Sequence, residues 1–86
     1  MYTLLYSPKA QKDAKKLAFS GLKENVEKLL NIIKVDPYVY PPEYEILKGK
    51  LKGFISRRIN KQHRLVYEVL EEEKIIKVLR MWTHYE

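Results

Sequence analysis

The sequence has 86 residues, 45% of them apolar, and carries a formal charge of +6; a chain of this length can bury one small core, so we expect a single domain over residues 1–86. It contains no cysteine, which excludes a disulfide framework and a thiolate metal site. No apolar run approaches the roughly 18 residues of a membrane span and no signal peptide is recognisable, so we expect a cytoplasmic protein without a membrane partner.

The first half of the chain predicts one strand and two helices. The aromatic and β-branched run at residues 2–6 is typical of a strand. Ser7 and Pro8 then offer an N-cap and a proline at the first helical position. Apolar residues at helical spacing follow in two blocks, 10–18 and 22–33, which are separated by Gly21 and ended by Pro37. These two helices should form a hairpin.

The second half predicts a series of strands. The proline-rich segment 36–43 cannot continue a helix, and we expect an ordered, extended loop that crosses the sheet edge. Strand-like runs follow at 45–47, 54–59, 63–70 and 74–82, separated by short turn segments. The resulting order, β-α-α-β-β-β-β, predicts an α+β fold. The helix hairpin would pack on one face of a mainly antiparallel sheet and leave the other face partly open.

Positive charge is concentrated in one segment of the chain. Residues 46–67 include seven lysines and arginines and no acid, while the remainder is nearly balanced. An acid-free block of this kind is the pattern expected for a protein that binds a polyanion, and nucleic acid is the natural candidate. The simpler interpretation is that lysine-rich strands protect the sheet edges and keep the protein soluble.

Strand alternation divides these side chains between two faces. Leu65, Tyr67 and Val69 should share the core face, because successive side chains of a strand point in opposite directions. By the same rule Arg58 and Arg64 can both lie on the uncovered face. That arrangement would focus positive charge on one concave surface.

A set of five residues could cleave RNA without a metal: Glu45, Arg58, Arg64, His84 and Tyr85. A base would take the proton of a ribose 2′-OH, the oxygen would attack the adjacent phosphate, and an acid would protonate the departing 5′-oxygen. Arginines would stabilise the charge that builds on the phosphate. A metal mechanism is disfavoured, since two histidines and no cysteine make a poor ligand set. Taken singly, these residues could be surface carboxylates and phosphate grips, and composition alone supports only a small basic α+β domain that binds nucleic acid.

Five short blocks carry a more specific combination of residues. They are Glu45-Ile-Leu-Lys48, Leu51-Lys-Gly53-Phe54, Ser56-Arg57-Arg58-Ile59, His63-Arg64-Leu65-Val66-Tyr67 and His84-Tyr85. Together they resemble the Txe/YoeB toxins of the RelE/ParE superfamily, and the likeness extends over nearly the whole chain. The resemblance implies a RelE-like fold and the toxin of a type II toxin-antitoxin system, an endoribonuclease that cleaves messenger RNA in the ribosomal A site.

The resemblance also implies roles for individual residues. The residue matching Glu45 would be the general base and the one matching His84 the general acid, with those matching Arg58 and Arg64 as phosphate stabilisers. Lys48 and Tyr85 would support them. Within the basic block we expect RNA contacts from Lys48, Lys50, Lys52, Arg57 and Lys61.

The expected partners are the ribosome, messenger RNA and an acidic antitoxin of the YefM/Phd type that folds on binding. A homodimer is also allowed, and no cofactor is expected. Two other functions stay open. One is a gyrase-inhibiting toxin of the ParE kind, which shares the fold but does not need the Glu, Arg and His set. The other is a non-enzymatic nucleic-acid-binding module.

Overall fold

The computed structural model describes residues 1–49 and 53–81. Along the chain lie β1 (Thr3–Tyr6), α1 (Pro8–Phe19), α2 (Lys23–Val35), β2 (Tyr44–Ile46), β3 (Ile55–Arg58), β4 (Arg64–Leu70) and β5 (Ile75–Arg80). The predicted order of elements is confirmed. Among the described residues, neither helix is long and apolar enough to cross a membrane.

Both helices begin and end where the sequence predicts. The Ser7 hydroxyl accepts a hydrogen bond of 3.0 Å from the backbone N–H of Ala10, and Pro8 occupies the first turn of α1. The same hydroxyl donates to the carbonyl of Leu79 at 2.8 Å, which ties the start of α1 to β5. Gly21 takes a φ of 73° between the helices, a left-handed conformation that costs glycine little.

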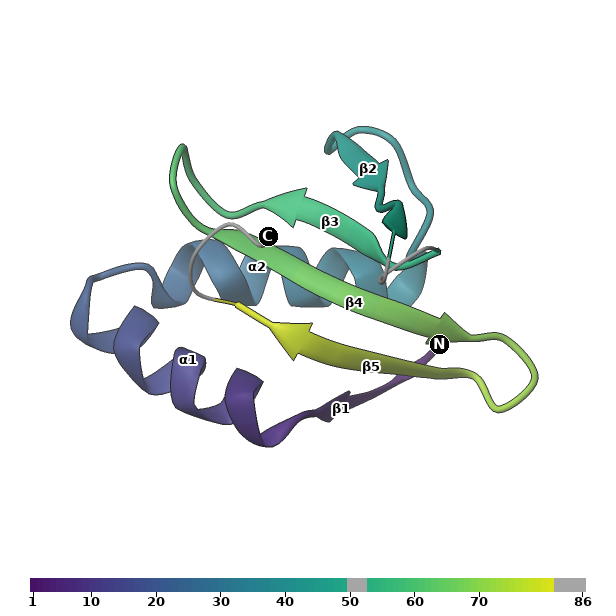
Figure 1. The fold of residues 1–86 in the computed structure, drawn as a ribbon, viewed down its shortest axis with the longest axis horizontal. Coiled ribbons are helices and arrows are strands. Elements are labelled where there is room, and N and C mark those ends of the chain that lie inside the picture. The colour runs from purple at the N-terminus through teal and green to yellow at the C-terminus, as the bar shows by residue number, and fades with distance from the viewer. Residues whose placement is uncertain (50–52, 82–86) are drawn as a thin grey trace.

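The five strands form one mixed sheet in the order β1-β5-β4-β3-β2 (Figure 1). Strands β2 to β5 are an antiparallel meander, whereas β1 is parallel to β5, with Thr3 opposite Ile75. The most N-terminal and the most C-terminal strands of the described chain are therefore neighbours, and β1 and β2 are the two edges.

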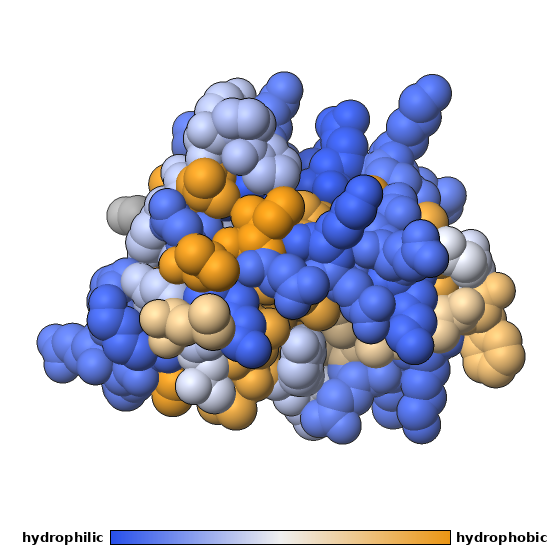
Figure 2. All heavy atoms as spheres, turned by 180° about the vertical axis from the view of Figure 1, so that it is seen from behind, coloured by the Kyte–Doolittle hydropathy of each residue, from blue (hydrophilic) through white to orange (hydrophobic). Residues whose placement is uncertain are grey.

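The helix hairpin covers one face of the sheet, as predicted (Figure 1). The core lies between these layers. The sheet contributes Ile55, Leu65, Tyr67, Ile76 and Val78, and the helices contribute Ala10, Leu17, Val26, Leu29 and Ile33. Burying a large apolar side chain of this kind stabilises a fold by about 1.5 to 3 kcal/mol relative to exposure. Seen from its outer side, the helical layer is mostly hydrophilic, with scattered hydrophobic patches (Figure 2).

One carboxylate is buried between α1 and the end of β5. Asp13 is only 2% exposed, and its Oδ2 accepts hydrogen bonds from Arg80 Nε at 2.9 Å and from the backbone N–H of Met81 at 3.1 Å. A buried carboxylate needs both a countercharge and donors. These hydrogen bonds hold Arg80 and Met81 against α1.

Candidate functional site

A polar hollow lies over β2, β3 and β4, on the sheet face opposite the core. It has a volume of about 220 Å³ and is lined by Glu43, Tyr44, Glu45, Ser56, Arg58 and Arg64, which we call the arginine pocket. Alternation explains why these side chains meet. Ile55 belongs to the core, so its neighbour Ser56 points the other way, and Ser56 is the cross-strand partner of Glu45.

Two arginines oppose each other in the arginine pocket. Arg58 and Arg64 are direct cross-strand partners on β3 and β4, so the predicted sharing of the open face is confirmed. Like charges placed directly opposite each other in a sheet destabilise it. An anion bound between the guanidinium groups would remove this repulsion. Paired guanidinium groups suit phosphate in particular, because their planar forks match its oxygens.

Glu45 stands beside this pair. Its Oε1 lies 3.3 Å from Nη1 of Arg64, and the two side chains are 64% and 25% exposed, respectively. An ion pair so open to water contributes little to stability. A phosphate could therefore compete with Glu45 for Arg64 at small cost, and the carboxylate would then stand next to the bound group.

Three residues of the arginine pocket were not predicted from the sequence: Glu43, Tyr44 and Ser56. Glu43 is two positions before Glu45, so strand alternation could have placed both carboxylates on one face. Ser56 is 2% exposed and forms part of the floor of the pocket. Its position between Ile55 and Arg57 was available as a signal, but serine alone indicates no role.

The prediction that Arg57 contacts RNA is wrong. Arg57 is 0% exposed and lies among the largest fully buried side chains of the described residues. Its guanidinium donates to Tyr67 Oη and to three backbone carbonyls of the loop before β2. The physical reason is alternation: Arg57 shares the core-facing side of β3 with Ile55, although it sits inside a run of basic residues.

The other predicted contacts are divided between exposed positions and residues outside the described ranges. Lys48 follows β2 and Lys61 lies in the β3–β4 turn, and both are exposed. Because β2 and β3 are antiparallel, these lysines lie toward opposite ends of β3. The predicted site residues Lys50, Lys52, His84 and Tyr85 fall outside the described residues.

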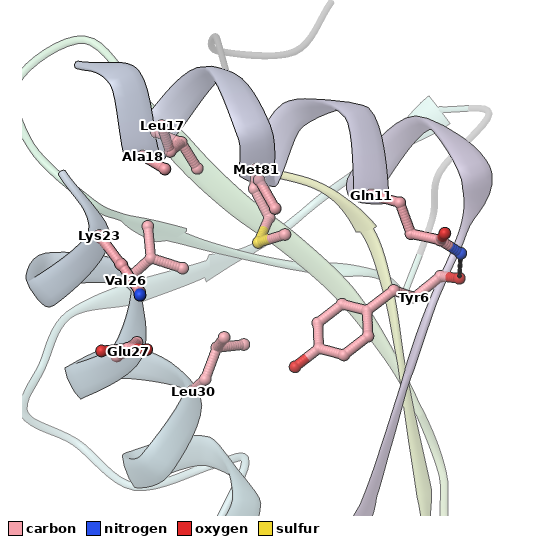
Figure 3. A pocket seen from close by; sticks show the side chains of 10 residues that line it. Tyr6, Gln11, Leu17, Ala18, Lys23, Val26, Glu27, Leu30 and Met81 are labelled. Carbon is pink, nitrogen blue, oxygen red and sulfur yellow. Dashed lines mark hydrogen bonds between the residues drawn. The ribbon is translucent and has the colours of Figure 1, made fainter. Parts of the chain in front are cut away.

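A second hollow, of about 330 Å³, lies between the two helices and β1 (Figure 3). Its walls are mainly apolar, with Leu17, Val26, Leu30 and Met81 among them, and Gln11 Nε2 donates to the Tyr6 carbonyl at 3.2 Å on one side. The groove lacks the paired guanidinium groups of the arginine pocket. Within residues 1–49 and 53–81, no group of three or more His, Asp or Glu side chains could hold a metal ion.

Comparison with known proteins gives one consistent result. The family model described as YoeB-like toxin of bacterial type II toxin-antitoxin system matches residues 8–85. A curated relative, Toxin YoeB of Synechocystis, is 37% identical over 65 residues, which are 76% of this chain and 73% of the relative.

Two solved structures are similar over almost their whole length. A YoeB-YefM complex from Staphylococcus aureus contains a chain that is 32% identical, with a TM-score of 0.81 and 99% of both chains covered. A YoeB dimer from Staphylococcus aureus is also 32% identical, with a TM-score of 0.79 and 98% of each chain covered. The predicted α+β fold, with two helices packed on one sheet, is confirmed by this likeness.

Proposed function

Because this chain belongs to the YoeB-like toxins of bacterial type II toxin-antitoxin systems, we propose that it is a ribosome-dependent endoribonuclease that cleaves messenger RNA. The observation that carries the proposal is the arginine pocket. It brings two opposed guanidinium groups and the carboxylates of Glu43 and Glu45 into one hollow on the sheet face opposite the core. The guanidinium groups can bind the scissile phosphate, and a carboxylate can act as the base that takes the proton of the attacking oxygen.

The proposed reaction begins at the ribose next to the scissile phosphate. Glu45 accepts the 2′-OH proton, and the 2′-oxygen forms a bond to phosphorus. The bond from phosphorus to the 5′-oxygen then breaks, and His84 donates a proton to that oxygen. The products are a 2′,3′-cyclic phosphate and a free 5′-hydroxyl, with one proton gained by Glu45 and one lost by His84.

Arg58 and Arg64 would stabilise the intermediate. The attack leaves a pentavalent phosphorus with extra negative charge on its oxygens, and preorganised guanidinium groups lower the energy of that charge more than that of the ground state. Their placement as cross-strand partners supports this role, since a doubly charged phosphorane relieves the repulsion between two like charges more than a singly charged phosphate does.

Binding of the RNA chain would extend beyond the pocket. Lys48 and Lys61, toward opposite ends of β3, suit contacts with phosphates on either side of the scissile one. We also assign Lys50 and Lys52 to RNA binding and Tyr85 to support of the reacting groups. We propose that the ribosome holds the message in a fixed orientation against the pocket, and that this orientation supplies part of the rate.

The proposed partners follow from the family. One similar structure is a YoeB-YefM complex and another is a YoeB dimer. We propose a YefM/Phd-type antitoxin for this chain, because an acidic segment would complement the formal charge of +6 that the chain carries. We also propose a homodimer, and a cytoplasmic location, where ribosomes and messages are found.

The test is induction of the protein in bacterial cells, with primer extension on a translated message. Wild type should cut the message at discrete positions within codons, whereas His84→Gln and Arg64→Gln should not. Lys9→Gln is the control, since it removes an exposed positive charge from α1, away from the pocket. Growth arrest with intact messages would favour a gyrase-inhibiting toxin. Normal growth with intact messages would favour a non-enzymatic RNA-binding module.

A further inference from the structure

The loop before β2 is built around a single buried side chain. Residues 36–43, the proline loop, end one position before β2 begins. Three of its carbonyls accept hydrogen bonds from the Arg57 guanidinium, those of Val39 at 2.8 Å, Pro37 at 3.1 Å and Pro42 at 2.5 Å. The proline loop therefore wraps around Arg57, which reaches it from β3.

Tyr67 completes this arrangement from β4. Its hydroxyl accepts from Arg57 Nε at 2.9 Å and donates to the Pro37 carbonyl at 2.7 Å. Burial raises the pKa of Tyr67, although the hydrogen bond from Arg57 acts in the opposite direction, so the hydroxyl keeps the proton that it donates. Only a planar fork with several N–H groups can hold four acceptors in fixed directions, and lysine cannot substitute for it.

The same guanidinium is in contact with the strand that carries Glu45. Arg57 and Tyr44 are cross-strand partners, and the Arg57 Cζ lies 4.6 Å from the centre of the Tyr44 ring. Glu45 is the next residue. Strand β2 has only three residues and lies at the edge of the sheet, so it has one neighbouring strand, β3. The position of β2 therefore also depends on the contacts that hold the proline loop, which leads into the start of β2.

We propose that Arg57 is a positioning residue for RNA cleavage: its buried guanidinium fixes the proline loop and Tyr44, and thereby holds Glu45 at the scissile phosphate beside Arg58 and Arg64. The inference rests on the proposed role of Glu45 as general base. Arg57 itself contacts neither the RNA nor the reacting atoms. Its effect passes through the placement of β2, and an error of about 1 Å in such a placement can cost about a hundredfold in rate.

Two variants weaken this anchor in different ways. Arg57→Lys keeps the charge and loses the fork, whereas Tyr67→Phe removes one hydroxyl and keeps Arg57. Tyr2→Phe is the matched control, because the Tyr2 hydroxyl also makes short hydrogen bonds, 2.6 and 2.8 Å to the Glu71 carboxylate, on the β4–β5 turn rather than at the site. Each is combined with Glu45→Gln, and kcat and KM for message cleavage on programmed ribosomes are measured.

We expect Arg57→Lys to lower kcat about ten- to hundredfold with KM nearly unchanged, because Arg58, Arg64 and the lysines still bind the RNA. Tyr67→Phe should lower kcat less, and Tyr2→Phe should not lower it. In the Glu45→Gln background, Arg57→Lys should have no further effect, since two residues that act through one step are not additive. Circular dichroism at the assay temperature establishes that each variant is folded.

The outcomes separate this inference from the proposed function. Unchanged cleavage by Glu45→Gln would overturn the assigned base, whatever Arg57 does. Loss of cleavage in Glu45→Gln, with a full and additive further loss from Arg57→Lys, would overturn the positioning role alone. A rise in KM with kcat unchanged would also overturn it, because it would place Arg57 in RNA binding. Should Arg57→Lys fail to fold, Tyr67→Phe decides: kcat equal to that of Tyr2→Phe contradicts the proposal.

Discussion

Arg57 and Arg58 are consecutive residues of β3, yet they belong to different parts of the molecule. Arg57 lies on the core side, fully buried, and donates to Tyr67 and to carbonyls of the proline loop. Arg58 lies on the open side, exposed, and faces Arg64 across the sheet. Two neighbouring residues with the same charge therefore have different roles in the structure. Each basic residue of a strand has to be assigned to the core side or to the open side of the sheet before it is predicted to contact nucleic acid.

The largest expected effect is on the free energy of unfolding, when Arg57 on the core side of β3 is replaced. Arg57→Ala should lower the free energy of unfolding by about 3 kcal/mol or more, because several buried acceptors lose their donors at once. Arg58→Ala should change it by less than about 0.5 kcal/mol, or raise it, since a like-charged neighbour is removed. Urea unfolding of both variants measures the difference. Equal free energies of unfolding of the two variants would show that the buried hydrogen bonds of Arg57 do not stabilise the fold.

The next largest effect is expected on the rate of message cleavage, when Arg64 in the arginine pocket is replaced. Arg64→Gln should lower the rate of message cleavage about a hundredfold, as expected when one donor to a charged intermediate is removed. Its free energy of unfolding should stay close to that of wild type, because the ion pair with Glu45 is open to water. Single-turnover cleavage on ribosomes and urea unfolding together measure both quantities. Retention of the wild-type rate would exclude Arg64 from the chemistry.

A smaller effect, on the melting temperature, tests whether an anion binds between Arg58 and Arg64. A dinucleotide whose 2′-oxygen is absent cannot be cleaved and should raise the melting temperature of wild type. A stabilisation of 1 kcal/mol corresponds to roughly 4–8 °C for a domain of this size. The shift should be lost in Arg58→Gln and kept in Tyr2→Phe. A shift of the same size in Arg58→Gln would place the anion elsewhere.

The smallest effect compares a buried tyrosine hydroxyl with an exposed one. The hydrogen bond from Tyr2 is the main cause of a lowered pKa of Glu71, and Tyr2 has a raised pKa for the same reason. The stabilisation that Tyr2→Phe removes should therefore be present at neutral pH. It should vanish as the pH falls through the lowered pKa of Glu71, and also as the pH rises through the raised pKa of Tyr2.

Urea midpoints of wild type and Tyr2→Phe at about pH 7 and about pH 3 measure this change. Tyr67→Phe serves as the reference, since its buried hydroxyl should matter more at both values. A Tyr2→Phe difference that persists unchanged in acid would show that the hydrogen bond to the carboxylate is not its source.

Local signals in the sequence predicted the elements and the face of the site. Ser7 and Pro8 start α1 because a cap and a fixed φ act within one turn. Alternation placed Arg58 and Arg64 together because the period of a strand is exact. Both inferences use only neighbours along the chain.

What the sequence could not predict depends on partners far along the chain. The acceptors of Arg57 are mostly backbone carbonyls, which every residue possesses, so no residue type marks them. Asp13 is buried because Arg80, 67 positions later, reaches it. The parallel pairing of β1 with β5 is equally distant, and no local pattern announces it.

That pairing has a consequence for how the protein is made. Thr3 to Tyr6 leave the ribosome about 70 residues before their pairing partners, Ile75 to Val78. The first strand must wait, with one edge open, while the helices and the meander emerge. Closing so long a segment is slow relative to local contacts. The sheet is therefore completed only after Ile75 to Val78 have emerged, which leaves an interval in which the nascent chain lacks the β1–β5 pairing.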